Sequence, residues 1–381
     1  MKWFVNGRQK QTAKASSAYE RCEKLEKQVL KTFNVAPIDG VLDDQIQHKI
    51  DMKTKPLGAL GGLESIAFQI ARIQNTLVPS VNKAKMIVFA ADHGAVAKGI
   101  SAFPQEVTPQ MVGNFLAGGA AVSVFSQQHN VPLKVVDVGV KVDMPDHPLL
   151  SQRKVAYGSK DFSETAALTL DEVNRALEAG AAEVTDAVDE GVELLMFGEM
   201  GIGNTGVSSC MLSAISGVEA KQTTGRGTGL DSEGVSKKAL IIDQALQRAA
   251  SELNKPAGEW APWEVATQVG GLEILAMAGA MLRSAELKKP YVVDGFICTV
   301  ALLFAKQVQA EVVAYAIFAH QSNEQAHQVL LEAFDATPIL KLDLRLGEGS
   351  GAILSYPIIQ SAVTFFNNMA SFEAAGVTNV S

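Results

Sequence analysis

Two acidic side chains stand in glycine-rich segments, where a carboxylate can lie close to a bound ligand. Glu348 is in residues 346–351 (LGEGSG), after an alternating run at 339–344, and Glu199 is in the similar segment 198–206. Glycine lets a chain turn sharply and lets its backbone approach a ligand. A carboxylate partly withdrawn from water binds a proton more tightly, so Glu348 is a candidate general base. The alternative is a loop carboxylate that accepts hydrogen bonds from backbone N–H groups at the start of a helix. The same two interpretations apply to Glu199.

The segment 201–206 (GIGNTG) matches the pattern G-x-G-x-x-G and opens a helical stretch. Free backbone N–H groups and the helix dipole at such a place suit a phosphate. A dinucleotide fold also needs an acidic residue about 20 positions later, at the end of a second strand. That distance falls in the loop 221–227 (KQTTGRG), which has no acidic residue. The motif therefore favours a mononucleotide phosphate over NAD.

A second glycine segment, 225–229 (GRGTG), precedes Asp231, which is a predicted N-cap of the helix 232–253. This helix carries Lys237 and Lys238. One of the two lysines can reach the same phosphate. The alternative for either lysine is a solvated helix face.

Histidine and aromatic residues give a further group of candidates. His93 has no partner at metal-ligand spacing, which favours a loop histidine satisfied by hydrogen bonds, and we assign no ligand role to His320 and His327. Residues 101–108 put Phe103 and hydroxyl groups just ahead of a helix. This arrangement suits a flat apolar ligand, or equally a capped helix with the ring in the core.

These residues need a scaffold that brings their loops together, and the hydrophobic pattern predicts one. Strand-like runs that are mostly too apolar for a solvated face occur at 86–91, 133–138, 194–197, 291–293, 312–318 and 339–344. Long helix-like stretches occur at 107–128, 171–189, 232–253, 272–283 and 352–372. This alternation is typical of a parallel sheet with crossover helices. Because polar and glycine residues follow most of the strands, we expect them to gather at the carboxyl edge.

Composition sets limits on the class of protein. A chain of 381 residues with 47% hydrophobic and 19% charged residues forms a well-buried globular protein, here one main domain with a small appendage. A net charge of -8 without a Lys/Arg block argues against a nucleic-acid partner. The three cysteines, Cys22, Cys210 and Cys298, form no Cys-x-x-Cys pair, which favours buried thiols in a reducing compartment.

The ends of the chain and its apolar runs favour a cytoplasmic location. The first ten residues lack an apolar signal region, and the longest uncharged apolar run, 296–305, is too short to cross a bilayer. We therefore expect no membrane partner. The first forty residues are predicted as a helical arm that stops near Pro37. We expect residues 1–36 to reach a neighbouring subunit, because their apolar stripe lacks an obvious local partner.

Several of these motifs occur together in one order: 92–94 with 101–108, 198–205, 225–229 and 346–351. Together they resemble the nicotinate-nucleotide:dimethylbenzimidazole phosphoribosyltransferase family, over about residues 53 to 376. Residues 55–61 (KPLGALG) look like the early motif of that family, which usually has serine where Ala59 stands.

The resemblance implies a homodimer with a Rossmann-like α/β fold. Its six-stranded, mostly parallel sheet would carry helices on both faces, and a small helical domain would come from the N- and C-terminal segments. The corresponding limits are 1–80 for the arm and part of the small domain, 81–350 for the catalytic domain, and 351–381 for the rest of the small domain.

The resemblance also implies a reaction and the residues that perform it. The phosphoribosyl group of nicotinate mononucleotide would move to dimethylbenzimidazole with inversion at the anomeric carbon, giving alpha-ribazole phosphate and nicotinate. Glu348 would be the general base. The phosphate and ribose would lie against Glu199, Gly201, Gly203, Asn204, Thr205, Gly227 and Lys238. The accepting base would lie against Ser101, Phe103, Gln110 and Leu346. No cofactor or metal would be required.

Two other classes of function remain open on the residues alone. An NAD-dependent oxidoreductase would use the segment 201–206 as a dinucleotide loop, although the acidic residue that this requires is missing. A non-catalytic nucleotide-binding module would use Glu348 only as a loop cap. The release of nicotinate from nicotinate mononucleotide in the presence of dimethylbenzimidazole distinguishes all three.

Overall fold

The computed structural model describes residues 29–378. Its six strands are all parallel and lie in the order β3-β2-β1-β4-β5-β6. Their bounds are β1 (Ala84–Ala91), β2 (Leu133–Gly139), β3 (Leu150–Gln152), β4 (Leu194–Met200), β5 (Tyr291–Val293) and β6 (Ala316–Phe318). The order reverses between β1 and β4, and in such sheets ligands bind beyond the carboxyl ends of the strands at this point. The predicted fold class is confirmed.

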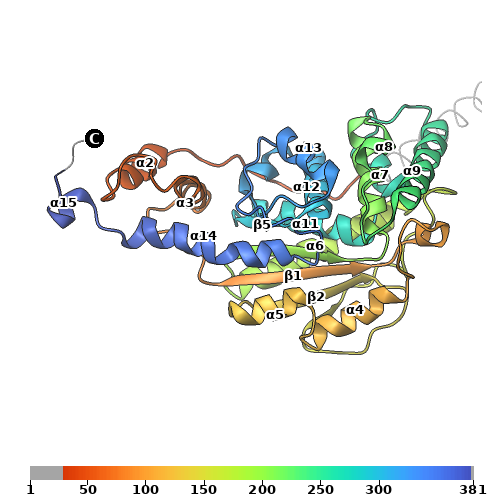
Figure 1. Ribbon diagram of the computed structural model, residues 1–381, viewed down its shortest axis with the longest axis horizontal. Helices are drawn as coiled ribbons and strands as arrows, with labels where there is room; N and C mark the ends of the chain where they lie inside the picture. Colours follow the sequence, from red (N-terminus) through yellow and green to blue (C-terminus); the bar gives the residue numbers. More distant parts are fainter. Residues whose placement is uncertain (1–28, 379–381) are drawn as a thin grey trace, which may run out of the picture.

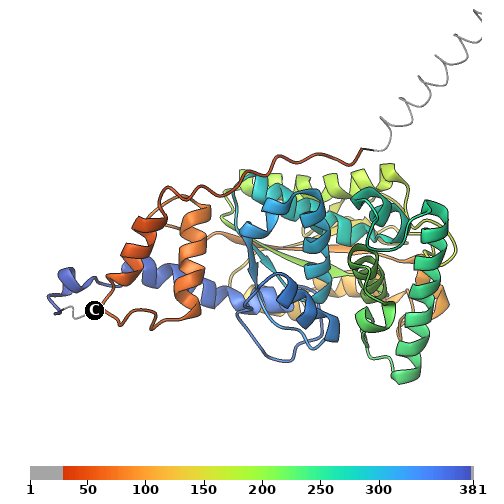
Figure 2. The same cartoon turned by 90° about the horizontal axis from the view of Figure 1, so that it is seen from above.

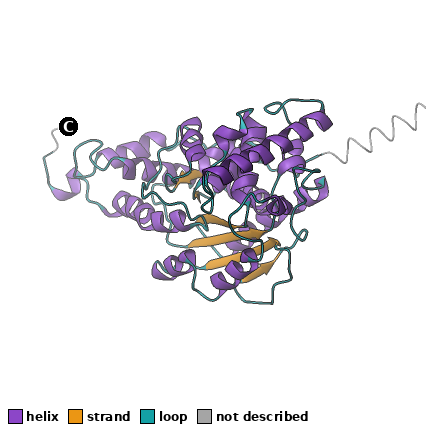
Figure 3. Cartoon of the chain, turned by 45° about the vertical axis from the view of Figure 1, so that its right-hand side comes forward, coloured by secondary structure: helices purple, strands orange, loops and turns teal. Residues whose placement is uncertain are grey.

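Helices cover both faces of the sheet (Figure 3). They are α2 (Asp43–Asp51), α3 (Gly62–Ile73), α4 (Val107–Leu116), α5 (Ala121–Gln128), α6 (Leu170–Asp189), α7 (Asn204–Ser216), α8 (Ala220–Thr223), α9 (Ser232–Leu253), α10 (Pro262–Val269), α11 (Leu272–Glu286), α12 (Phe296–Val308), α13 (Gln325–Ala333), α14 (Ser350–Asn368) and α15 (Phe372–Ala375), with 3-10 turns η1 (Gly94–Lys98) and η2 (Ala310–Tyr315). Successive residues of β1 enter opposite cores: Ile87 packs with α6 and α11, and Val88 packs with α4, α5 and α14. A strand buried on both faces reads as a continuous apolar run, as this one does.

A small helical unit is built from both ends of the chain. Ile46 of α2 and Ala67 of α3 share a buried cluster with Ala362 and Phe366 from the far half of α14. Figure 1 shows α2 and α3 beside that half of the long helix. The near half of α14 packs on the sheet instead, so this helix joins the two parts. The limits predicted for the three segments stay a prediction.

The segment before α2 is extended, and Figure 2 shows it running along the outer helices. Phe33 and Val35 are buried, and the Tyr315 hydroxyl donates to the Ala36 carbonyl at 2.9 Å. The predicted helical arm is therefore wrong for residues 29–40, because their apolar side chains already find partners on the main domain. The remainder of that prediction, and Cys22, lie outside the described residues.

The strand predictions were partly wrong although the total of six agrees. Residues 339–344 form no strand, since only Leu340 makes a bridge, to His320, and Asp343 has a left-handed φ of 55°. Residues 310–315 are a 3-10 turn, which leaves β6 with three residues. The short edge strand β3 was missed.

The helix predictions agree more closely. The range 232–253 coincides with α9, and Asp231 caps it by accepting a hydrogen bond from the Gly234 N–H at 2.8 Å. The stretch 107–128 is two helices rather than one, because the chain turns at Gly118 with a φ of 80°. Within residues 29–378, no helix has both the length and the apolar character that crossing a membrane requires.

Candidate functional site

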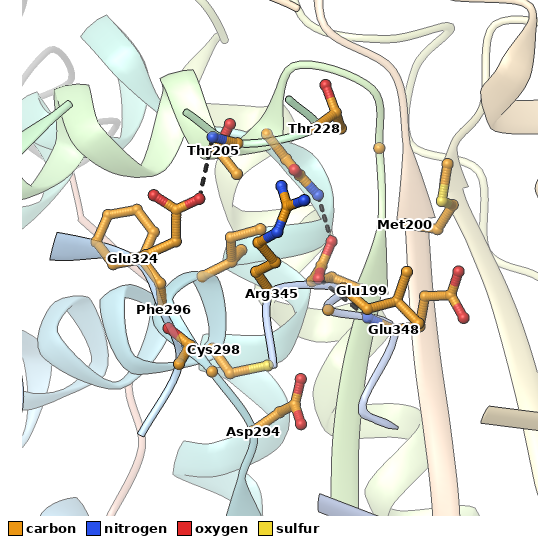
Figure 4. A pocket seen from close by; sticks show the side chains of 18 of the residues that line it. Glu199, Met200, Thr205, Thr228, Asp294, Phe296, Cys298, Glu324, Arg345 and Glu348 are labelled. Carbon is orange, nitrogen blue, oxygen red and sulfur yellow. Dashed lines mark hydrogen bonds between the residues drawn. The ribbon is translucent and has the colours of Figure 1, made fainter. Parts of the chain in front are cut away.

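A cavity of about 310 Å³ lies at the carboxyl edge of the sheet (Figure 4). Its walls come from the loops after β1, β4, β5 and β6, from the loop after α8, and from the segment that leads into α14. The lining residues are Phe103, Val107, Met111, Glu199, Met200, Gly201, Ile202, Asn204, Thr205, Gly227, Thr228, Asp294, Gly295, Phe296, Ile297, Cys298, His320, Ser322, Glu324, Arg345, Leu346, Gly347 and Glu348. Segments that are far apart in the sequence thus share one space.

The first glycine segment forms the turn from β4 into α7. Gly203 has a φ of 92°, a left-handed conformation that suits glycine, and α7 begins at Asn204. Gly201, Asn204 and Thr205 line the cavity, so the positive end of this helix dipole faces the space. Gly203 itself lies behind the wall, against Val96 and Ile100. Free N–H groups at such a turn suit an anion.

One of the two predicted lysines faces this turn. The Lys238 ammonium is fully buried and donates to the Thr205 Oγ1 at 2.8 Å, whereas Lys237 is exposed. Burial lowers the pKa of Lys238 to about 8. The ammonium lies behind Thr205 and Gly227, both of which line the cavity. A buried cation is therefore available next to two glycine segments.

Glu348 is held in an unusual backbone conformation. Its φ is 64°, and its neighbours Gly347 and Gly349 have φ values of 80° and 81°. Left-handed φ costs about 1–2 kcal/mol for a side chain such as glutamate, so surrounding structure must impose it. A Cβ at position 349 would overlap the Met86 side chain, and one at position 347 would overlap the Glu199 carboxylate. The two glycines therefore allow the close approach that places Glu348.

The Glu348 carboxylate is buried but incompletely paired. It is only 6% exposed, and its Oε2 has no hydrogen-bond partner among the described residues. Burial raises the pKa of Glu348 to about 7, although the Val122 N–H opposes the rise. In Figure 4 this carboxylate points away from Asp294 and toward the side on which Met200 lies. Such a group can accept a proton near neutral pH.

Glu199 belongs to β4 rather than to the following loop, because that strand continues to Met200. Its carboxylate accepts hydrogen bonds from the Asn204 amide and from the Glu348 N–H, the latter at 3.3 Å. Burial, with smaller contributions from the Asp294 and Glu273 carboxylates, raises the pKa of Glu199 well above its usual range. This side chain therefore joins the glycine segment 198–206 to the glycine segment 346–351.

The residues predicted for the accepting base are only partly brought together. Phe103 and Leu346 line the cavity, at its exposed mouth. The Ser101 hydroxyl lies 3.2 Å from the Thr228 hydroxyl at the rim. Gln110 is exposed on α4 and does not line the cavity of this chain.

Sequence reasoning missed several polar lining residues. Asp294 accepts from the Ala352 N–H at 2.8 Å and so caps α14, while His320 Nε2 lies 3.5 Å from the same carboxylate. Glu324 and Arg345 extend from two other loops. The position of Asp294 after a predicted strand was the available signal, but nothing in the sequence indicated that Glu324 and Arg345 line the same cavity.

His93 makes one of the hydrogen bonds predicted for it, while its Nδ1 has no partner among the described residues, and the lack of a ligand role for His320 and His327 stays a prediction. His93 Nε2 lies 2.9 Å from Glu273 Oε1, and both side chains are fully buried. His327 Nδ1 accepts from the Ser322 N–H at 3.0 Å, and burial lowers the pKa of His327 to about 4. Among residues 29–378, no group of three His, Cys, Asp or Glu side chains is arranged to hold a metal ion. The cavity therefore combines turns that suit an anion, an apolar mouth and one partly paired carboxylate.

Comparisons with known proteins agree in one direction. The family model described as DBI_PRT, phosphoribosyltransferase, matches residues 35–377. A nicotinate-nucleotide–dimethylbenzimidazole phosphoribosyltransferase of Cupriavidus taiwanensis is 45% identical over 347 residues, covering 91% of this chain and 98% of the relative. One of Dechloromonas aromatica is 46% identical over 92% of this chain and 99% of the relative. The crystal structure of CobT from Thermus thermophilus superposes with a TM-score of 0.84 at 40% identity, covering 89% of this chain and 99% of that structure.

Proposed function

This chain belongs to the nicotinate-nucleotide–dimethylbenzimidazole phosphoribosyltransferase family, and we propose that it transfers phosphoribosyl from nicotinate mononucleotide to dimethylbenzimidazole with inversion at the anomeric carbon. The products would be alpha-ribazole phosphate and nicotinate. One observation carries the mechanism: Glu348, with an unpaired Oε2, shares a cavity with the glycine turns. A base and an anion site are thus available to one substrate pair.

Glu348 is the proposed general base. The azole must lose its N–H proton as its nitrogen attacks the anomeric carbon, and that proton passes to the Glu348 carboxylate. The bond from this carbon to the pyridinium nitrogen breaks at the same time, and its electron pair leaves with nicotinate. Because the pyridine nitrogen departs neutral, no general acid is needed, unlike in glycosidases, whose leaving oxygen must be protonated. General-base help is worth about 10²- to 10⁴-fold, and positioning of two ligands adds more.

The phosphate is proposed to lie between the two glycine segments. Gly201, Gly203 and Gly227 would offer their turns, Lys238 would neutralise the charge from behind, and Thr205 stands in between. Glu199 and Asn204 would flank the ribose. The pairing of a buried ammonium with a helix N-terminus supports this assignment.

The accepting base is proposed to lie at the apolar side of the cavity. Phe103 and Leu346 would cover its flat rings. Ser101 and Gln110 belong to the same proposal, although both are outside the cavity of a single chain. A homodimer is proposed as well.

The experiment that tests the activity incubates the protein with nicotinate mononucleotide and dimethylbenzimidazole. We expect one nicotinate and one ribazole phosphate for each mononucleotide consumed. Nicotinate release that is independent of dimethylbenzimidazole would indicate a hydrolase instead. A nicotinamide absorbance change with NAD would favour an oxidoreductase, and the absence of any turnover would favour a binding module.

Neighbouring lysines supply a matched pair for the phosphate site. Lys238→Met should raise KM for nicotinate mononucleotide about 10- to 100-fold, because it removes the buried positive charge behind the phosphate turn, a loss of about 1.5–3 kcal/mol. Lys237→Met removes the same charge from the exposed neighbouring position and should leave KM unchanged. Equal effects of the two substitutions would refute the assignment of Lys238.

A further inference from the structure

Glu324, the residue before α13, lies against the second glycine segment. Its Oε1 accepts a hydrogen bond from the Gly227 N–H at 3.0 Å, drawn as a dashed line in Figure 4. A Cβ at position 225 would overlap Glu324 Oε2, so Gly225 makes room for this carboxylate. The Glu324 carboxylate is therefore bound to a backbone N–H of the turn to which we assign the phosphate.

The charges around Glu324 match those that a phosphate would meet. Lys238 and Arg345 are the cations that act on its carboxylate. Within the described part of the chain, Lys238 donates to the Thr205 hydroxyl and the Gly225 carbonyl, neither of which carries a negative charge. Glu324 is the charge that opposes the effect of burial on the pKa of Lys238. Glu324 thus partly neutralises a buried ammonium, which is the role proposed for the phosphate.

A second space lies beside Glu324. This polar cavity of about 600 Å³ is lined by Glu324 and Arg345, which also line the first cavity, and by Arg226. Glu324 stands before the first turn of α13, but its side chain makes no capping bond to that helix. Rotation about its own side-chain bonds can therefore carry the carboxylate from Gly227 toward the two arginines.

We propose that Glu324 is a displaceable internal anion that holds the phosphate turn in the absence of substrate and moves into the second cavity when the phosphate binds. The proposal rests on the assignment of both glycine segments to phosphate. One N–H cannot serve two anions, and their like charges repel each other. Molecules in which Glu324 covers Gly227 cannot bind phosphate. The apparent Kd is therefore the intrinsic Kd divided by the fraction of molecules in which Gly227 is uncovered.

A different role would give the opposite result. A carboxylate near a ribose can accept hydrogen bonds from its hydroxyl groups, as in dinucleotide folds. In that case removal of Glu324 would weaken binding of nicotinate mononucleotide and leave binding of inorganic phosphate unchanged. Inorganic phosphate carries no ribose and therefore isolates the anion site.

The test is a calorimetric titration of the full chain with inorganic phosphate. Glu324→Ala should lower the Kd about tenfold, as expected if the carboxylate covers the turn in about nine molecules of ten. Glu332→Ala removes a carboxylate from the exposed face of the same helix and should leave the Kd unchanged. Gly225→Ala should push the Glu324 carboxylate from the turn while its charge remains, and should also tighten binding.

Unchanged or weaker phosphate binding by Glu324→Ala overturns the proposal. Should that variant fail to fold, Gly225→Ala decides by the same criterion. The outcome is separable from that of the activity assay. If the protein is active but its variants do not bind phosphate more tightly, the transferase function is supported and the displacement of Glu324 is refuted. If the variants bind phosphate more tightly but the protein shows no turnover, the displacement is supported and the transferase function is refuted.

Discussion

The two glycine segments that carry Glu199 and Glu348 differ in how their carboxylates are held. Glu199 accepts one hydrogen bond from Asn204 of its own segment and one from the Glu348 N–H of the other segment. Glu348 leaves Oε2 without a partner among the described residues and has a left-handed backbone. Burial raises the pKa of both, so burial alone does not separate their roles. We infer that Glu199, whose two oxygens both accept hydrogen bonds, holds the site together. Glu348, whose Oε2 accepts none from the described residues, is available to a substrate.

The largest expected effect comes from Glu348→Gln. It removes the proton acceptor but keeps the shape of the side chain, so turnover should fall by about two orders of magnitude or more, with the Kd for nicotinate mononucleotide nearly unchanged. Single-turnover kinetics and a binding titration measure the two quantities. Wild-type turnover by this variant would end the distinction between the two carboxylates.

The next effect is on stability and concerns Glu199. Asn204→Ala removes a buried donor to Glu199, so the unfolding free energy should fall by about 2 kcal/mol. Denaturant unfolding measures it, with Glu348→Gln as the matched comparison. Since Glu348 Oε2 has no partner to lose within residues 29–378, that variant should be at least as stable as the parent. Equal losses in both variants would contradict the comparison.

The third prediction uses pH. The pKa of Glu348 is raised from 4.5 to about 7, so below that value kcat/KM should fall about tenfold for each pH unit as the base is protonated. The folded state holds this proton more tightly than the unfolded state, so stability from Glu348 is present at low pH and is lost as pH rises from 4.5 to about 7. Glu348→Gln should lack this part of the loss. A flat kcat/KM profile across this range would be inconsistent with Glu348 as the base.

The smallest effect isolates the backbone of Glu348. Glu348→Gly and Glu348→Ala both remove the carboxylate, but only glycine adopts a φ of 64° without strain. The glycine variant should therefore be more stable than the alanine variant by about 1 kcal/mol, and both should lose turnover by at least as much as Glu348→Gln. Thermal unfolding compares them. Equal stability would mean that the surroundings relax around an alanine at this position.

Local chemistry in the sequence predicted much of the scaffold. The cap at Asp231 and the turn at Gly203 need only neighbouring residues, so their patterns were sufficient. The run 339–344 misled because alternation predicts a strand only when one side of it is buried, and Leu342 is 56% exposed. The edge strand β3 has three residues and no distinctive pattern.

Only some of the residues that line the cavity were predictable from the sequence. Glu348 and Gly201 carry their own signal in the glycines around them. Glu324 and Arg345 carry none, since each is an ordinary loop residue until β6 and α14 bring them to one place. Their convergence depends on contacts between residues far apart in the chain.

The long helix α14 fixes a register between two parts of the molecule. Ile353 and Ile359 of its near half pack on the sheet, and Ala362 and Phe366 of its far half pack on α2 and α3. One residue inserted between Ile359 and Ala362 would rotate everything downstream by about 100° and withdraw Phe366 from its cluster. Evolution can therefore exchange side chains along this helix but cannot readily change its length.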